Sequence, residues 1–414
     1  MKERVLRTAE KVFSYASKLS LDDIVVKVVY ERSVMIKFAN SQPSVYQDWD
    51  EISVIIMMAK DERIAGLTFE TSRIEDIIRV LKERVKVLPK LKPSPYYAPL
   101  PEPKPVNPIP GLVDKKLIKA ILNPSDLANL IVSEASKADE FAGMIQLTHR
   151  IKALKTSAGA DLSEESTELK SYIRVFEDEG SGQWAYGSTK LDVKSIERMV
   201  EKAVEYAKAS KAPKPLQPGR YDIVFSPMVI GNLATYLGWM ASAMIADMGM
   251  SMFIKYKPGV QIASEIFTLL DIPRNSSLPG ATSFDDEGVP TYDKPIIERG
   301  VFKTFLHSTG TAKRYGTQST GNSVGIMPQA WNLEIKPGDY SEEEIIKDVK
   351  NGIFITNNWY TRLQNYIEGV FSTVSRDAAF LIQNGEIKHP ITRFRIADTC
   401  LLYTSDAADD GESV

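Results

Sequence analysis

The chain has 414 residues, of which 43% are hydrophobic and 25% are charged, so it carries enough apolar material for more than one core. Lysine and arginine total 51, and aspartate and glutamate total 54. The formal net charge of −3 excludes the chain-wide positive field that is typical of nucleic-acid-binding proteins. No apolar run approaches the roughly 18 residues that span a bilayer, and one cysteine cannot form a disulfide within the chain. We therefore expect a cytoplasmic protein that binds neither membrane nor nucleic acid.

The first predicted unit covers residues 1–90. Its opening residues show the apolar spacing of an amphipathic helix and lack the uninterrupted apolar run of a secretory signal. Ser72 and Glu75 form a capping-box pattern before a second predicted helix, at residues 74–88. Glu31 and Arg32 separate the first two of four β-rich runs, which predicts a hairpin there. The four runs are residues 24–30, 33–39, 51–59 and 63–68.

A proline-rich segment, residues 91–111, follows. Nine of the 23 prolines fall between positions 89 and 110, and proline fixes φ and lacks an N–H group, so neither a helix nor a strand ladder can persist there. We interpret the segment as a semi-rigid extended linker, and a ligand for a proline-binding module is the alternative.

The middle unit, residues 112–212, is predicted to contain a helix, three strands and a second helix. Its predicted elements are residues 125–138, 141–154, 169–176, 183–188 and 193–209.

The third predicted unit covers residues 218–399. A strand at 221–225 leads into a long helical pattern that continues to about residue 253, and short strands and helices alternate after it. The predicted fold class is therefore α+β, with two smaller α/β units followed by a larger, β-rich mixed C-terminal domain.

Residues 400–414 form a tail that we interpret as an artefact. Residues 400–410 can be encoded, codon by codon, by the transposon-end adapter of sequencing libraries. A polar, frayed C-terminus is the alternative. If the adapter is the source, the natural reading frame is lost near Thr399, and the natural part of the chain shown here has no cysteine.

The chemistry-bearing side chains form no recognisable catalytic motif. His149, His307 and His389 stand alone, so each is best explained by packing or local hydrogen bonding, and no cluster has metal-ligand spacing. Nucleophile motifs and phosphate loops are also absent from the sequence. The acidic run at residues 285–288 is interpreted as an exposed turn, with a hard-cation site as the alternative.

The segment 228–252 is rich in methionine. Six methionines lie in it, and thioether side chains repack easily, so they can line surfaces that accept varied partners. Because the run is apolar on most faces, a buried helix is the simpler interpretation.

Several short stretches resemble the TldD/PmbA metallopeptidase family on its PmbA (TldE-like) branch. They keep the family's order and spacing together, and the similarity is tightest over residues 221–399. The matching stretches are residues 155–159, 286–290, 297–303, 312–316, 319–322 and 384–387, with Pro390.

The resemblance carries one departure that decides the expected chemistry. Catalytic members of the family carry His-Glu-x-x-x-His on the helix after the strand that ends near Phe225. Here that helix, residues 230–240, contains neither histidine nor glutamate. Without those ligands it cannot generate a zinc-bound hydroxide. The family's cysteine ligand would fall beyond residue 399, so its absence carries no information.

The resemblance therefore implies a non-catalytic subunit that pairs with a TldD-like catalytic subunit in a hetero-oligomer. We expect no cofactor in this chain and zinc in the partner. The substrate expected for such a pair is an unfolded or extended peptide, held by main-chain pairing to a strand edge. This subunit would supply part of the wall of the peptide cavity. The candidate wall residues are Tyr236, Trp239, Met240 and Met244.

Two other functions stay open from the sequence. One is a stand-alone peptide-binding or scaffold protein, and the other is an autonomous hydrolase with an unrecognised site.

Overall fold

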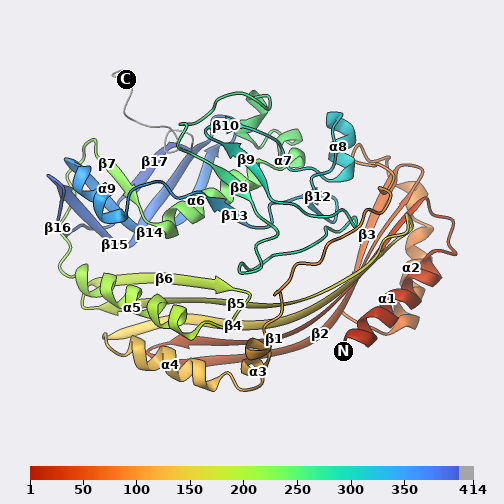
Figure 1. Ribbon diagram of the computed structural model, residues 1–414, viewed down its shortest axis with the longest axis horizontal. Helices are drawn as coiled ribbons and strands as arrows, with labels where there is room; N and C mark the ends of the chain where they lie inside the picture. Colours follow the sequence, from red (N-terminus) through yellow and green to blue (C-terminus); the bar gives the residue numbers. More distant parts are fainter. Residues whose placement is uncertain (401–414) are drawn as a thin grey trace.

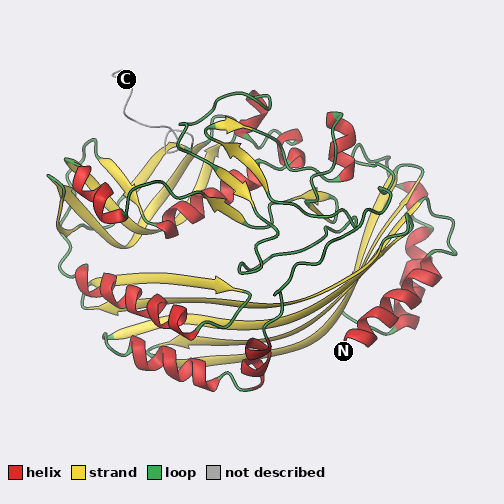
Figure 2. Ribbon diagram, viewed as in Figure 1, coloured by secondary structure: helices red, strands yellow, loops and turns green. Residues whose placement is uncertain are grey.

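The computed structural model describes residues 1–400, and the predicted tail beyond Cys400 lies outside the described residues (Figure 1). The predicted mixed α+β class is confirmed, because large sheets alternate with helices along the chain (Figure 2). Within residues 1–400, none of the helices combines the length and the apolar character needed to cross a membrane.

One six-stranded antiparallel sheet joins the first two predicted units. Its strand order is β3-β2-β1-β4-β5-β6, and β1 pairs with β4 along almost its whole length. Residues 1–90 and 112–212 therefore share a single sheet, although each half has its own apolar core. The strands are β1 (Asp23–Ala39), β2 (Gln42–Lys60), β3 (Arg63–Phe69), β4 (Glu140–Thr156), β5 (Asp161–Glu177) and β6 (Gly180–Ser188).

Helices cover one face of this sheet, which is its outer, convex face in Figure 2. Side chains of a strand alternate between the two faces, and the even-numbered apolar residues of β1, from Ile24 to Phe38, pack in the cores under the helices. Odd-numbered residues such as Lys27 and Lys37 therefore face the other way, toward the C-terminal domain. The covering helices are α1 (Lys2–Ala16), α2 (Ile74–Val85), α3 (Lys115–Leu122), α4 (Ser125–Ala135) and α5 (Val193–Ala209).

The hairpin predicted at Glu31 and Arg32 is wrong, because β1 runs through both residues. Glu31 is paired with Glu51 on one side and with Arg150 on the other, and the Arg150 guanidinium lies 2.7 Å from the Glu31 carboxylate. A cross-strand ion pair thus stabilises the charged pair inside a strand. The predicted capping box at Ser72 is also wrong, since α2 begins after Arg73 without a side-chain cap.

The C-terminal domain contains two main sheets, of orders β16-β15-β14-β7 and β10-β9-β8-β13, with β17 added beside β15 and a small β11-β12 pair. Its strands are β7 (Asp222–Phe225), β8 (Leu269–Asp271), β9 (Lys294–Glu298), β10 (Val301–Phe302), β11 (Ser323–Val324), β12 (Met327–Pro328), β13 (Leu333–Ile335), β14 (Asn351–Asn365), β15 (Val370–Gln383), β16 (Glu386–Pro390) and β17 (Arg395–Thr399). Its helices are α6 (Pro227–Met240), α7 (Ala243–Asp247), α8 (Thr309–Tyr315) and α9 (Glu342–Asp348), and 3-10 turns lie at Leu88–Lys90 and Met252–Lys255.

The single long helix predicted to residue 253 is broken after Met240. The backbone of Ala241 and Ala243 forms hydrogen bonds with Leu306, whose N–H group donates to Ala241 and whose carbonyl accepts from Ala243. These bonds replace the helical ladder, so α7 begins as a separate helix.

The C-terminal domain lies over the concave face of the large sheet and is attached near both ends (Figure 1). At one end Lys27 of β1 forms an ion pair with Asp286, 2.5 Å long. At the other end Arg174 of β5 forms an ion pair with the buried side chain of Asp377, also 2.5 Å long. Beside the second pair, Tyr206 of α5 packs against Phe354 of β14.

A buried ion pair stabilises the core of this domain. Lys294 is 4% exposed, and its Nζ lies 3.0 Å from the Asp271 carboxylate, which also accepts hydrogen bonds from Asn322 and Trp331. The substitution Lys294→Met leaves the carboxylate buried without its cation, so we expect it to lower the free energy of unfolding by roughly 3–5 kcal/mol in urea titrations. Lys303→Met removes an exposed ion pair with Glu298 and should lower it by less than about 1 kcal/mol. Equal losses would contradict this ranking.

His307 makes stability depend on pH. It is buried, and this burial lowers the pKa of its imidazole from 6.5 to about 4. Protons therefore bind the unfolded chain more readily, so the stability supplied by neutral His307 is complete above pH 6.5 and is lost as the pH falls toward 4. Between pH 7 and 4.5 we expect the wild type to lose roughly 2 kcal/mol more than His307→Gln in chemical unfolding. Parallel pH profiles for the two proteins would show that this histidine does not act in this way.

Candidate functional site

The acidic run at residues 285–288 joins the C-terminal domain to the large sheet. Asp285 is 1% exposed and accepts backbone N–H groups from Glu287, Val289 and Ser323 at 2.9–3.0 Å. Burial raises the pKa of both Asp285 and Glu287, and at Asp285 the charge of Glu287 adds to the rise. The interpretation as an exposed turn is wrong: the turn exists, but it is buried because its carboxylates hold surrounding backbone in place.

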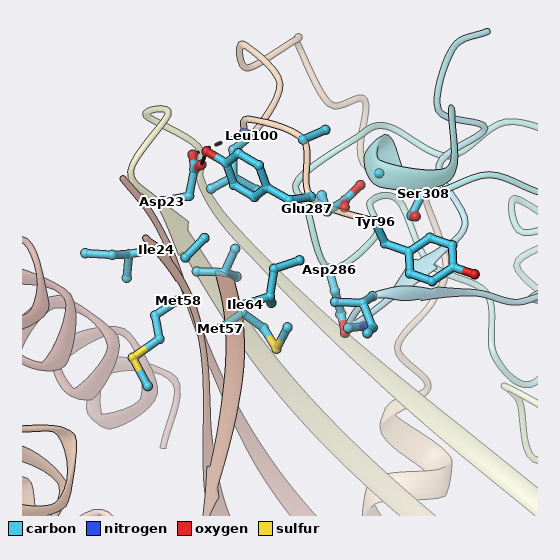
Figure 3. Close-up of a pocket in the computed structure, with 17 residues that line it drawn as sticks. Asp23, Ile24, Met57, Met58, Ile64, Tyr96, Leu100, Asp286, Glu287 and Ser308 are labelled. Atoms are coloured by element: carbon cyan, nitrogen blue, oxygen red, sulfur yellow. Dashed lines mark hydrogen bonds between the residues drawn. The ribbon is translucent and has the colours of Figure 1, made fainter. Parts of the chain in front are cut away.

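A small cavity lies beside this turn, between the large sheet and the proline-rich segment (Figure 3). Asp23 holds that segment by accepting hydrogen bonds from the Tyr97 hydroxyl at 2.8 Å and the Leu100 N–H at 3.1 Å. The residues 91–111 contain no helix or strand, as predicted, but they are bound to the protein surface. The cavity measures about 60 Å³, which admits only a few water molecules. The cavity lies where the proline-rich segment packs against the large sheet, and it is too small to hold a peptide.

A larger surface groove lies between α6 and an irregular part of β14, which are neighbours in the fold (Figure 1). Pairing of β14 with β15 shifts register three times, and Tyr360 in this stretch has a φ of +56°. Bulges of this kind re-aim side chains and are common beside functional sites. The groove has a volume of about 590 Å³. Its lining residues are Thr235, Tyr236, Trp239, Thr361, Arg362, Leu363 and Tyr366.

Neutral polar side chains form a hydrogen-bonded network beside the groove. The Thr361 hydroxyl donates to Asn232 Oδ1 at 2.8 Å, and the Asn358 amide donates to Thr373 at 3.0 Å. The Tyr236 hydroxyl donates to the Thr361 carbonyl oxygen at 2.9 Å, which ties α6 to the bulge. Among the described residues, the buried Oδ1 of Asn358 has no hydrogen-bond partner. This network fixes the wall of the groove but contains no group that ionises near neutral pH.

The four candidate wall residues divide into two pairs. Tyr236 and Trp239 line the groove, and the Trp239 ring lies 5.9 Å from the ring of Tyr366. Met240 and Met244 are 0% and 2% exposed, so they belong to the core and cannot form an accessible wall. The sequence interpretation of a buried helix holds for these two methionines.

The side chains around α6 do not fit a catalytic zinc ion. Zinc in proteins is bound by imidazole, thiolate and carboxylate groups, whereas this helix offers the Asn232 amide and the Thr235 hydroxyl. Over residues 1–400, no three His, Cys, Asp or Glu side chains are gathered closely enough to hold a metal ion. No metal-dependent step follows from this site.

Each of the three histidines contacts only its own local partners. His149 forms a 2.8 Å contact with Glu165 on the large sheet, and His307 packs between Phe305 and Tyr315. His389 contacts the carbonyl oxygen of Pro390. Each therefore has the local role that the sequence predicts.

The sequence interpretation missed the groove residues that come from β14 and from the turn after it. Thr361 and Arg362 of β14 and Tyr366 of the turn line the groove, yet they lie in a segment with no recognised motif. One signal was present: Asn357 and Asn358 interrupt an apolar strand, and asparagine is uncommon inside strands. That pair marks the start of the bulged region.

Comparison with known proteins identifies the C-terminal part of the chain. Residues 218–406 match the family described as the PmbA/TldA metallopeptidase C-terminal domain. A metalloprotease of Methanothermobacter thermautotrophicus is 30% identical over 67% of this chain and 66% of its own length. Metalloprotease PmbA of Escherichia coli O157:H7 is 28% identical over 45% of this chain and 40% of its own length. The chain thus spans about two thirds of the first relative's length and two fifths of the second's.

The whole fold also matches a solved structure. TldE from Thermococcus kodakarensis superposes with a TM-score of 0.81 over 97% of this chain and 92% of its own, at 24% identity. At that identity the match establishes the fold. The family match shows that this chain carries a C-terminal domain of the PmbA/TldD metallopeptidase family over residues 218–406.

Proposed function

We propose that this chain is the non-catalytic, peptide-binding subunit of a heteromeric metallopeptidase. Its zinc-bearing partner would be a TldD-like member of the same family, and the substrate would be an extended or unfolded peptide. The single observation that carries the proposal is the character of α6. This helix follows β7 and borders the groove, as expected for the helix that binds metal in catalytic members, yet it carries no metal-binding side chain.

The groove supports the binding half of the proposal. Tyr236, Trp239 and Tyr366 present aromatic surface that buries large areas with little loss of side-chain entropy. Arg362 adds a cation that can donate to peptide carbonyl groups. Aromatic surface with few directional donors favours extended chains of varied sequence, because most of the contact is independent of the substrate side chains.

The proposal predicts which mixture cleaves peptide. The full chain is produced alone, a TldD-like homologue with His-Glu-x-x-x-His is produced alone, and the two are co-expressed. We expect the chain alone to leave an unstructured fluorogenic peptide intact, and we expect the co-purified pair to cleave it in a reaction that chelators stop. Chelator-sensitive cleavage by the chain alone would overturn the proposal. Peptide binding without any co-purifying homologue would favour a stand-alone binding protein.

A groove variant tests the peptide-binding role within the same assay. Tyr366 is 38% exposed and lines the groove, so Tyr366→Ala should raise the KM of the pair at least several-fold and leave the stability of the chain nearly unchanged. Tyr340→Ala is the matched control, because Tyr340 is 74% exposed and lies outside the groove. Equal KM values for the two variants would exclude the groove as the binding surface.

A further inference from the structure

A second hollow opens between the concave face of the large sheet and the C-terminal domain, and its charged lining is entirely basic. Its volume is about 470 Å³. Lys37 of β1, Arg174 of β5 and Arg376 of β15 are its charged residues, and Tyr172 and Gln183 add polar groups. No aspartate or glutamate is among the residues that line it.

Strand register explains why these side chains gather. Lys37 pairs with Met144, which in turn pairs with Tyr172, so Lys37 and Tyr172 project from the same face of the sheet. Arg174 lies two residues after Tyr172 and pairs with Gln183, which places both on that face as well. The opposite face is packed under helices, so this cluster faces the C-terminal domain.

Strand β15 supplies Arg376 to the hollow, and a bulge in that strand aims the side chain. Asp377 has a φ of +61°, and the pairing of β14 with β15 shifts register next to it, between Ile355 and Asn357. A bulge lets neighbouring side chains point the same way. Asp377 reaches Arg174 on the large sheet, and Arg376 lines the same hollow.

The positive charge in this hollow is only partly balanced. Arg174 is paired with Asp377, whereas Lys37 and Arg376 form no ion pair within residues 1–400. Burial and the nearby Arg174 lower the pKa of Arg376, and the neighbouring Asp377 carboxylate, which is engaged by Arg174, only partly opposes this shift. The hollow thus holds two cations without an ion-pair partner among the described residues, and both are open to an anionic group.

A row of contacting arginine and aromatic side chains runs from the hollow to the groove. Arg376 lies 5.4 Å from the ring centroid of Trp359, whose ring is 5.7 Å from that of Tyr360. Arg362, which lines the groove, lies 4.2 Å from the Tyr360 ring centroid. Arg376 of β15 pairs with Asn357 of β14, and Arg362 lies about five residues further along β14. The two arginines are therefore separated by on the order of 15 Å along that strand.

We propose that the basic hollow binds a carboxylate of the peptide whose chain lies in the groove. The proposal rests on the peptide-binding function above and adds a recognition rule to it. Arg376 and Lys37 donate charge-assisted hydrogen bonds to the carboxylate oxygens, and Arg174 stays engaged with Asp377. A peptide's terminal carboxylate and an acidic side chain near its end share this chemistry.

The test measures binding to the full chain by fluorescence anisotropy. The probe is a dansyl-labelled ten-residue peptide of alanine, serine and valine, made with a free C-terminus, with an amidated C-terminus, and amidated with glutamate as its last residue. We expect amidation to weaken binding at least ten-fold. Restoration by the glutamate would show that side-chain carboxylates are accepted, and no restoration would restrict the site to chain ends.

Variants assign the effect to the hollow. Arg376→Gln should weaken binding of the free-acid peptide to the level of the amidated one and change binding of the amidated peptide less than two-fold. Arg198→Gln makes the same charge change at an exposed side chain of α5, outside this hollow. It should leave the binding of both the free-acid and the amidated peptide unchanged. Equal binding of free-acid and amidated peptides would overturn the carboxylate rule and leave the groove intact. Failure of all three peptides to bind would overturn the groove proposal as well.

Discussion

Two ion pairs, Lys27 with Asp286 and Arg174 with Asp377, fix the C-terminal domain over the large sheet. Both reach across from the concave face, whose strand side chains alternate away from the helix-covered core. The basic hollow lies beside the second attachment and is lined by both parts of the chain, whereas the groove is lined by the C-terminal domain alone. A continuous strand such as β1, seventeen residues long, makes the separation of the two attachments possible.

The proposed function separates peptide binding in this chain from cleavage in its partner. Residues that line the groove come from α6, β14 and the turn after β14, and those that line the basic hollow come from β1, β2, β4, β5, β6 and β15, so strand register and bulges shape both surfaces. The helix beside the groove supplies amide and hydroxyl groups, which hydrogen-bond well but do not ionise to activate water. Under the proposed function this chain binds the peptide, and another subunit brings the metal that activates water.

Sequence patterns predict most of the helices and strands but few of the contacts between elements that lie far apart in the chain. Helix α5 was predicted at its observed bounds, and the alternation in β4 and β5 identified both strands. The hairpin predicted at Glu31 and Arg32 is wrong because Glu31 is stabilised inside the strand by Arg150, which lies more than a hundred residues away, and Arg32 is paired with Asp48 of β2. The buried acidic turn was misread for the same reason, since Asp286 meets Lys27 only in the folded chain. Tyr236 and Trp239 were found through a family resemblance, whereas Arg376 required the bulge of β15 to be seen.

The side chains around α6 lead us to expect that this chain does not itself hold a catalytic metal ion. Elemental analysis of tag-free protein, incubated with excess zinc and then desalted, measures this directly, with the TldD-like partner treated in parallel. The account predicts well under one zinc per molecule of this chain and about one per molecule of the partner. One tightly held zinc per molecule of this chain, removed only by strong chelator, would contradict it.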